Sequence, residues 1–306
     1  MDFTNKNVII TGGSSGIGKA TAKLFARGGS NVFIVARNRE RLDEALAEIT
    51  AEQTNTDQRF EAFSTDVTRY EDVEATITAV AESSDNALIL INSAGIVRPG
   101  YFEELALADF QAQMDVNYLG TLHAVKAVVP HMKARGSGHI VNISSIAGVI
   151  GLFGYTAYSA SKFAVIGFSA ALRTELKPHN IRVSVVVPND TDTPQLQEER
   201  ELQCLETKVC EGMVKPKKLS RPSEYAAYWL VKLINDGGQP LDPEQVAQAI
   251  VKGVGRGSYL IVPDPLFGIA YRLRGFVVPL ANWAFDRLVP AARRQKKGSD
   301  SGDLSS

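Results

Sequence analysis

The chain has 306 residues, of which 44% are hydrophobic and 22% are charged, and its formal net charge is -1 at pH 7. This composition is typical of a protein with a large buried core, and the near-zero charge gives no reason to expect a nucleic-acid partner. The cysteines are too few for a disulfide framework and the histidines have no zinc-ligand spacing, so we expect a reducing compartment and no metal site.

Short apolar runs rich in β-branched residues alternate with segments of helical length and period. The runs predict about seven strands, at Asn7–Ile10, Asn31–Val35, Phe60–Ser64, Leu88–Ile91, His139–Ile143, Ile181–Val187 and Tyr259–Val262. Helical segments such as Gly16–Arg27 and Arg39–Glu52 separate them. This alternation predicts an α/β fold, a doubly wound parallel sheet of the Rossmann type, in one domain over residues 1–264.

A glycine-rich segment, TGGSSGIG, follows the first predicted strand and opens the first predicted helix. Glycine lets the backbone turn tightly and approach a pyrophosphate, which the amide groups and dipole of a helix N-terminus then hold. The expected cofactor contacts in this turn are Gly12, Ser14, Ser15, Gly16, Ile17 and Gly18. Taken alone, the motif also fits a plain strand-to-helix turn.

The end of the second strand predicts which nicotinamide cofactor binds. An enzyme that selects NAD usually has a carboxylate there for the ribose 2′-hydroxyl, but this chain has Ala36, followed by Arg37, Asn38, Arg39 and Arg41. Guanidinium groups favour a 2′-phosphate, so Arg37, Asn38 and Arg41 predict NADP (NADPH). The alternative is a solvated basic helix start, although cations are poorly placed at a helix N-terminus.

Two tyrosines and a lysine lie in the segment NISSIAGVIGLFGYTAYSASK. If a helix begins near Tyr158, Lys162 lies one turn further on the same face, whereas Tyr155 precedes the helix. Acid–base work near neutrality requires lowering a tyrosine pKa by roughly 2–3 units, and a neighbouring ammonium favours the phenolate. Ser145 ends the fifth strand, at the edge where open α/β sheets bind ligands.

Together, the glycine turn, the NSAG segment at residues 92–95, Asn117, Ser145 and Tyr158-x3-Lys162 resemble the short-chain dehydrogenase/reductase superfamily as far as about Thr193. The resemblance implies that Tyr158 donates a proton to a carbonyl and that Lys162 modifies its pKa and binds the cofactor ribose. It implies that Ser145, rather than the adjacent Ser144, polarises the carbonyl oxygen. Asn117 would hold a water that relays protons through Lys162. The further cofactor contacts that it implies are Asp66, Val67, Asn92, Ala94, Gly95, Tyr158, Lys162, Pro188, Thr191 and Thr193.

The segment PNDTDTP at residues 188–194 resembles the 3-ketodihydrosphingosine reductases, as do GLFGYTAYSASKFA, PEQVAQAIVKG and LETK elsewhere in the chain. Asn189 stands where those relatives tend to have a proline. The resemblance implies NADPH-dependent reduction of the 3-keto group of a long-chain 2-amino ketone, a lipid-like substrate. Asp190 or Asp192 is our hypothesis for pairing with the substrate amine, and helix capping or turn hydrogen bonding is the equally weighted alternative.

Two C-terminal regions depart from the strand–helix alternation. Residues 195–240 are largely charged and predict a helical flap, which contains an amphipathic piece at residues 223–234 to which we assign no role. Residues 265–297 are apolar but interrupted by Arg274 and Asp286, so they predict an interfacial rather than a spanning segment. Packing on the sheet or on a dimer partner is the alternative. Residues 298–306 predict a disordered terminus.

The first apolar run leads directly into the glycine turn and does not resemble a signal peptide, so we expect a cytoplasmic protein. With a lipid-like substrate and an interfacial tail, we expect it to be peripheral on the cytosolic face of a membrane, and we also expect a homo-oligomer. Two other functions compete with the first: reduction of another lipophilic carbonyl, such as a 3-oxoacyl thioester or a steroid, and non-catalytic NADPH binding by a regulator. The complete set of Asn117, Ser145, Tyr158 and Lys162 argues against the regulator, which needs no phenol–ammonium pair.

Overall fold

A parallel sheet forms the centre of the molecule in the computed structural model, which describes residues 3–202, 239–284 and 286. The strands have the order β3-β2-β1-β4-β5-β6-β7 and pair in parallel throughout. They are β1 Lys6–Thr11, β2 Asn31–Ala36, β3 Phe60–Ser64, β4 Ala87–Asn92, β5 Gly138–Ile143, β6 Ile181–Val186 and β7 Leu260–Ile261. The predicted doubly wound α/β class is confirmed.

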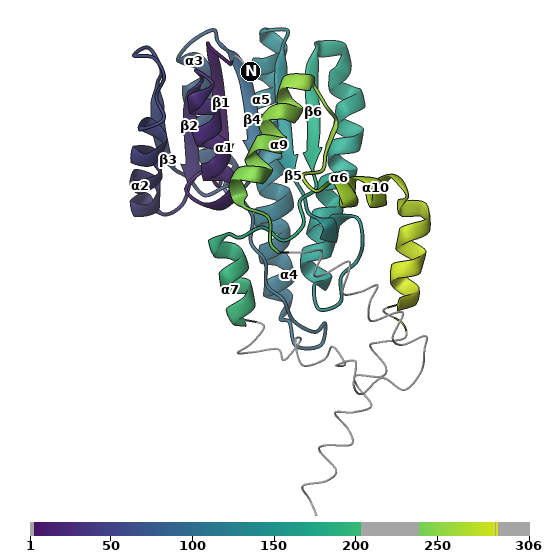
Figure 1. Ribbon diagram of the computed structural model, residues 1–306. Helices are drawn as coiled ribbons and strands as arrows, with labels where there is room; N and C mark the ends of the chain where they lie inside the picture. The colour runs from purple at the N-terminus through teal and green to yellow at the C-terminus, as the bar shows by residue number, and fades with distance from the viewer. Residues whose placement is uncertain (1–2, 203–238, 285, 287–306) are drawn as a thin grey trace, which may run out of the picture.

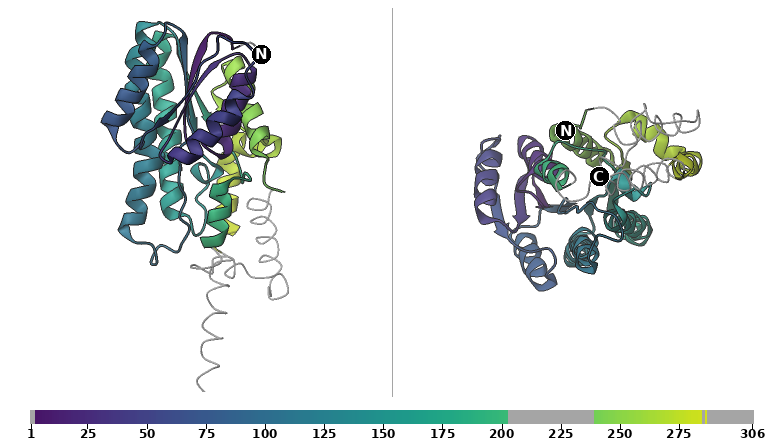
Figure 2. Two further views of the ribbon diagram at one scale, coloured as in Figure 1. Left: turned by 90° about the vertical axis from the view of Figure 1, so that its left-hand side faces the viewer. Right: turned by 90° about the horizontal axis from the view of Figure 1, so that it is seen from below.

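Helices cover both faces of the sheet, as Figures 1 and 2 show. The α-helices are α1 Gly16–Arg27, α2 Arg39–Thr50, α3 Tyr70–Glu82, α4 Leu107–Met114, α5 Gly120–Ala134, α6 Thr156–Leu176, α7 Pro194–Leu202, α9 Pro243–Arg256 and α10 Pro265–Arg272. Apolar side chains of α1, α2 and α9 form one core with the sheet, and those of α3, α5 and the end of α6 form the other. A further helical stretch at residues 274–284 follows α10.

The seven predicted strands are all present, and no strand end differs from the predicted one by more than one residue. Their apolar residues explain the agreement, because strands such as β1 and β4 are buried on both faces and each large core side chain stabilises the fold by about 1.5–3 kcal/mol. Helix α1 has the predicted bounds, and α2 ends two residues earlier than predicted, at Thr50.

The strand order reverses between β1 and β4: β2 and β3 follow β1 on one side of this point, and β5, β6 and β7 follow β4 on the other. Open α/β sheets bind ligands in the crevice beyond the carboxyl ends of the strands at such a point. The glycine turn after β1, the loop after β4 and Ser145 after β5 all lie at this edge.

The two C-terminal regions are described only in part. Helix α7 begins the predicted flap, but residues 203–238, including the piece at residues 223–234, lie outside the described residues, as does the predicted terminus at residues 298–306. Within the described part of the chain, none of the helices combines the length and the apolar character needed to span a membrane.

Candidate active site

The glycine turn between β1 and α1 leaves no room for side chains. Gly12 and Gly16 have φ values of +68° and +50°, in the left-handed region that disfavours other residues. A Cβ atom on Gly12 would lie 2.7 Å from the backbone nitrogen of Ala94, and one on Gly16 would lie 2.9 Å from Cγ2 of Thr193. Ser15, the N-cap residue of α1, makes no side-chain capping bond. The turn therefore presents bare backbone at the N-terminus of α1, which fits a dinucleotide pyrophosphate.

Basic residues lie at the end of β2, as predicted. Arg37 and Arg41 are both exposed. Asn38 is the N-cap of α2, where its Oδ1 accepts a hydrogen bond of 2.9 Å from the backbone N–H of Arg41. Burial acts to raise the pKa of Asp66, but hydrogen bonds from Thr68 and the positive charges of Arg37 and Arg69 lower it overall. Arg37 is therefore close enough to Asp66 for its charge to act on that carboxyl.

The loop after β4 forms the wall between the glycine turn and the buried polar groups. The backbone N–H of Ala94 donates to Oγ1 of Thr11 at 3.3 Å. A Cβ atom on Gly95 would lie 3.3 Å from Oδ1 of Asn117 and 3.5 Å from Nζ of Lys162. Nδ2 of Asn92 donates to Oδ1 of Asn142 at 2.8 Å, and this contact ties β4 to β5 inside the sheet.

Asn117 lies in a π-helical turn, Asp115–Leu119, between α4 and α5. Such turns are rare in proteins, and those that occur are often found at functional sites. The side chain is buried and fully engaged: Nδ2 donates to the carbonyl of Ile96 at 2.9 Å and to Oγ of Ser161 at 2.9 Å, and Oδ1 accepts from the backbone N–H of Ile96 at 2.8 Å. Asn117 thus holds the β4 loop against α6, beside Lys162.

Tyr158, Lys162 and Ser145 come together as their spacing predicts. Helix α6 begins at Thr156 with Tyr155 as its N-cap residue, so Tyr158 and Lys162 share one helical face. Nζ of Lys162 lies 5.6 Å from the centre of the Tyr158 ring and donates to the carbonyl of Ile143 at 3.2 Å. Tyr158 is also hydrogen-bonded to Ser145. A phenol, a hydroxyl and an ammonium in this arrangement suit proton transfer to an oxygen atom.

The pKa of Tyr158 moves in the direction opposite to the predicted one. Burial raises it, the hydrogen bond with Ser145 opposes that rise, and the negative charges of Glu199 and Asp190 add to it. Burial also lowers the pKa of Lys162 to about 8. Both shifts have the same cause, because burial disfavours the charged form of either group. Tyr158 consequently keeps its proton at neutral pH, as a proton donor must.

The two adjacent serines have different partners. Oγ of Ser144 donates to the carbonyl of Lys162 at 2.9 Å and is buried against α6. Oγ of Ser145 accepts from the backbone N–H of Ala147 at 3.1 Å, and the hydroxyl is also hydrogen-bonded to Tyr158. Only Ser145 therefore has its hydroxyl directed to the tyrosine.

The segment after β6 folds back over the glycine turn. The carbonyl of Pro188 accepts from the backbone N–H of Ile146 at 3.0 Å, which fixes the start of this segment beside the Ser145 loop. Thr191 is buried and forms a parallel bridge with Leu241. The methyl group of Thr193 lies where a Cβ atom on Gly16 would collide with it. Oγ1 of Thr193 accepts a hydrogen bond from the backbone N–H of Leu196 at 3.3 Å. Thr193 thus connects α7 to the turn.

Asp190 and Asp192 are both exposed, and their backbone groups pair with Leu241 at 2.8 and 2.9 Å. The negative charge of Asp190 adds to the rise that burial causes in the pKa of Tyr158. Asn189, at the position where the relatives in the resemblance have proline, donates from Nδ2 to Oδ2 of Asp264 at 3.3 Å.

Glu199 was not predicted as a site residue, and no role in the site was predicted for Tyr155. Glu199, on α7, accepts a hydrogen bond of 2.5 Å from the hydroxyl of Tyr155, whose ring makes an edge contact with Tyr158 at 6.4 Å. Burial raises the pKa of Glu199 to about 7, against the effect of the Tyr155 hydrogen bond. A sequence signal existed, because Leu196 and Glu199 are three residues apart and share one face of the helix.

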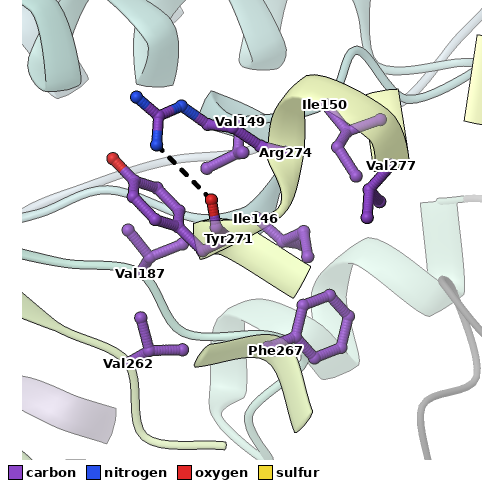
Figure 3. A pocket seen from close by; sticks show the side chains of 9 residues that line it. All are labelled: Ile146, Val149, Ile150, Val187, Val262, Phe267, Tyr271, Arg274 and Val277. Carbon is purple, nitrogen blue, oxygen red and sulfur yellow. Dashed lines mark hydrogen bonds between the residues drawn. The ribbon is translucent and has the colours of Figure 1, made fainter. Parts of the chain in front are cut away.

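An apolar groove lies next to Ser145, at the carboxyl ends of β5, β6 and β7 (Figure 3). Its enclosed volume is only about 10 Å³, so the lining side chains nearly fill it. The lining comes from the loop after β5, the ends of β6 and β7, and the helices after β7: Ile146, Val149, Ile150, Val187, Val262, Phe267, Tyr271, Arg274 and Val277. The groove begins one residue from Ser145, and its lining is apolar apart from Tyr271 and Arg274.

Comparisons with known proteins agree with the resemblance in the sequence. A family model described as short chain dehydrogenase matches residues 6–203. A 3-dehydrosphinganine reductase of Danio rerio is 39% identical over 260 residues, which are 85% of this chain and 71% of the relative. A 3-ketodihydrosphingosine reductase of Mus musculus is 39% identical over 254 residues, 83% of this chain and 69% of the relative. A variant of the actinorhodin polyketide ketoreductase, solved with NADPH, has 28% identity and a TM-score of 0.70, and the match covers 86% of this chain and 97% of that one.

Proposed function

The chain belongs to the short-chain dehydrogenase family, and from this premise we propose that it reduces the 3-keto group of 3-ketodihydrosphingosine to the alcohol with NADPH. The observation that carries the proposal is the 39% identity, over 85% of the chain, with a reductase named for this substrate. The group of half-buried Tyr158 and Ser145 with buried Lys162, beside the glycine turn, supports carbonyl reduction. The product is a sphingoid base, so the chain acts in sphingolipid metabolism.

The residues of the crevice suit NADPH. The glycine turn and the N-terminus of α1 would hold the pyrophosphate, and Arg37 and Arg41 would hold the 2′-phosphate. Asp66 and Val67 would flank the adenine, while Lys162 and Thr193 would reach the ribose and the nicotinamide side. When bound, the dihydronicotinamide supplies a hydride to the carbonyl carbon.

The chain's own residues then supply the proton. Ser145 hydrogen-bonds to the carbonyl oxygen and fixes it beside Tyr158, whose hydroxyl donates its proton to that oxygen as the alcohol forms. Lys162 stabilises the resulting phenolate by its charge. Asn117, which holds the β4 loop beside Lys162, positions the route by which Tyr158 regains a proton.

A lipophilic substrate is supported by the groove beside Ser145. The carbonyl group would lie at Ser145 and Tyr158, and the alkyl chain would part the apolar side chains of the groove as it enters. Burial of each methylene contributes about 0.8 kcal/mol to binding, so the apolar lining favours a long chain over a short one.

We further propose that the C-terminal helices contact a membrane surface without crossing it. Ile269 lies on α10, Leu273 follows the end of α10, and Phe276 and Leu280 lie four residues apart on the next helical stretch; they are 55%, 50%, 81% and 49% exposed. Arg272 and Arg274 lie among them and suit anionic headgroups. Such contact fits a cytoplasmic protein on the cytosolic face of a membrane. The homo-oligomer stays a prediction.

A panel of ketones tests the proposed reaction. Purified full-length protein is mixed with NADPH, and absorbance is followed with 3-ketodihydrosphingosine, the matched ketone without the amine, a 3-oxoacyl thioester and a steroid ketone. The amino ketone is expected to have the largest kcat/KM, and Tyr158→Phe is expected to lower its kcat by roughly 100-fold or more. Rejection of the amino ketone with turnover of the thioester would assign the chain to another lipophilic carbonyl.

A further inference from the structure

Glu199 lies on the inner face of α7, close to Tyr155, the N-cap residue of α6, and to Tyr158 on that helix. Leu196 is buried and Glu199 is half-buried on the same face, whereas Glu198, between them in the chain, is exposed. The hydrogen bond of 2.5 Å from Tyr155 fixes Glu199 Oε1, and the Tyr155 ring contacts the Tyr158 ring. One carboxylate is therefore held within reach of the reacting phenol.

The charges around Glu199 are mostly negative or neutral. Asp190 on the β6 loop raises its pKa, Arg200 on its own helix lowers it, and Tyr155 is its hydrogen-bond donor. The negative charges of Glu199 and Asp190 both add to the rise that burial causes in the pKa of Tyr158 on α6. Among the described residues, no lysine or arginine forms an ion pair with Glu199, and the hydrogen bond from Tyr155 uses one of its two carboxylate oxygens. A half-buried carboxylate in this setting suits a cation brought by a ligand.

We propose that Glu199, positioned by Tyr155, binds the 2-ammonium group of the substrate and thereby selects amino ketones over plain ketones. The inference rests on the proposed function, because that substrate has its amine on the carbon next to the carbonyl. With the carbonyl oxygen at Tyr158 and Ser145, the ammonium must lie beside Tyr158, where Tyr155 holds Glu199. Asp190 adds a second negative charge to the same side of the site.

The binding of the ammonium changes the protonation of Glu199. The pKa of its carboxyl is raised to about 7, so near neutrality about half of the molecules have the neutral acid. An ammonium favours the ionised form and lowers this pKa. Preference for the amino ketone should therefore increase as the pH rises from about 6 to about 7, and loss of the carboxyl should remove that increase.

The test compares Glu199→Gln with wild type on 3-ketodihydrosphingosine and on the matched ketone without the amine. Glu199→Gln is expected to lower kcat/KM for the amino ketone by about 10- to 100-fold, mostly through KM, and to change that for the plain ketone by less than about threefold. Glu198→Gln, an exposed neighbour, is the matched control and should change neither. Tyr155→Phe should show a loss with the same selectivity, because it releases Glu199 and removes the hydrogen bond that lowers the pKa of its carboxyl.

The outcomes separate the two proposals. If wild type reduces the amino ketone and Glu199→Gln retains the full preference for it, the role of Glu199 is wrong while the reaction stands. If wild type does not reduce the amino ketone, the proposed function itself fails. A similar loss on both ketones would mean that Glu199 only shapes the site. Thermal unfolding checks folding: Glu199→Gln should be at least as stable as wild type at pH 8, because burial penalises the ionised carboxyl.

Discussion

Ser144 and Ser145 are neighbours whose hydroxyls act in different directions. The Ser144 hydroxyl faces α6 and donates to the carbonyl of Lys162, whereas the Ser145 hydroxyl is bonded to Tyr158. The extended backbone at Ser145 explains the difference, since successive side chains of an extended segment point to opposite sides.

The two serines give a matched pair of variants. Ser145→Ala should lower kcat for ketone reduction by roughly 100-fold or more, because it removes a donor to the developing oxyanion, while leaving the melting temperature nearly unchanged. Ser144→Ala should retain most of the activity but lose about 1 kcal/mol of unfolding free energy with its buried hydrogen bond. Steady-state kinetics and thermal unfolding measure both. An equal loss of activity in the two variants would contradict the assignment.

The sequence could predict those site residues whose spacing along a helix fixes their relative positions. Tyr158 and Lys162 are four residues apart and share a helical face. Glu199 was not predicted, because its partner Tyr155 is distant in the chain and only the folded segment after β6 brings them together. The pKa of Tyr158 was predicted in the wrong direction, because burial depends on the assembled site rather than on the neighbouring lysine alone.

At the scale of elements, the start of α2 decides the choice of cofactor. Arg37 is exposed and close to Asp66, whereas Arg39 forms an ion pair of 2.9 Å with Asp43 on its own helix. Arg37→Ala should raise KM for NADPH by about 10- to 100-fold and leave KM for NADH nearly unchanged, because a charge-assisted bond to the 2′-phosphate is lost. Arg39→Ala is the control. Equal changes for both cofactors in Arg37→Ala would contradict a 2′-phosphate contact.

Elements with a clear hydrophobic pattern were the predictable ones. The strands are apolar and β-branched and were found nearly where predicted, and α1 has the predicted bounds. The π-helical turn Asp115–Leu119 could not be predicted, because one extra residue in a helical turn leaves no mark in an apolar period. The end of α2 at Thr50 depends on fraying and capping rather than on the pattern.

At the scale of the whole molecule, the C-terminal helices have two different sides. Phe267, Tyr271 and Val277 line the groove beside the site, while Ile269, Leu273 and Phe276 face solvent. The sequence predicted an interfacial tail or a packed one, and the described part has features of both. Its inner side chains were not predicted to line the groove, since their partners lie on β5, β6 and β7.

A flotation assay tests the membrane proposal. Full-length protein is mixed with vesicles of phosphatidylcholine containing an anionic phospholipid. The double variant Leu273→Ser and Phe276→Ser should lower partitioning by about tenfold or more, because two apolar side chains leave the lipid interface. The control is Leu107→Ser, which alters a leucine that is 87% exposed on α4. Equal flotation of the variant and the wild type would remove the membrane claim.

The bridge between Thr191 and Leu241 couples the active site to a residue far along the chain. Backbone hydrogen bonds of Asp190 and Asp192 to Leu241 fix the segment that leads into α7 at Pro194. Thr193 and Glu199 both follow this anchored segment, and Glu199 accepts its hydrogen bond from Tyr155 on the far side of the site. A substitution at Leu241 that disturbs the bridge would therefore shift catalytic geometry through the backbone, without touching any side chain of the site.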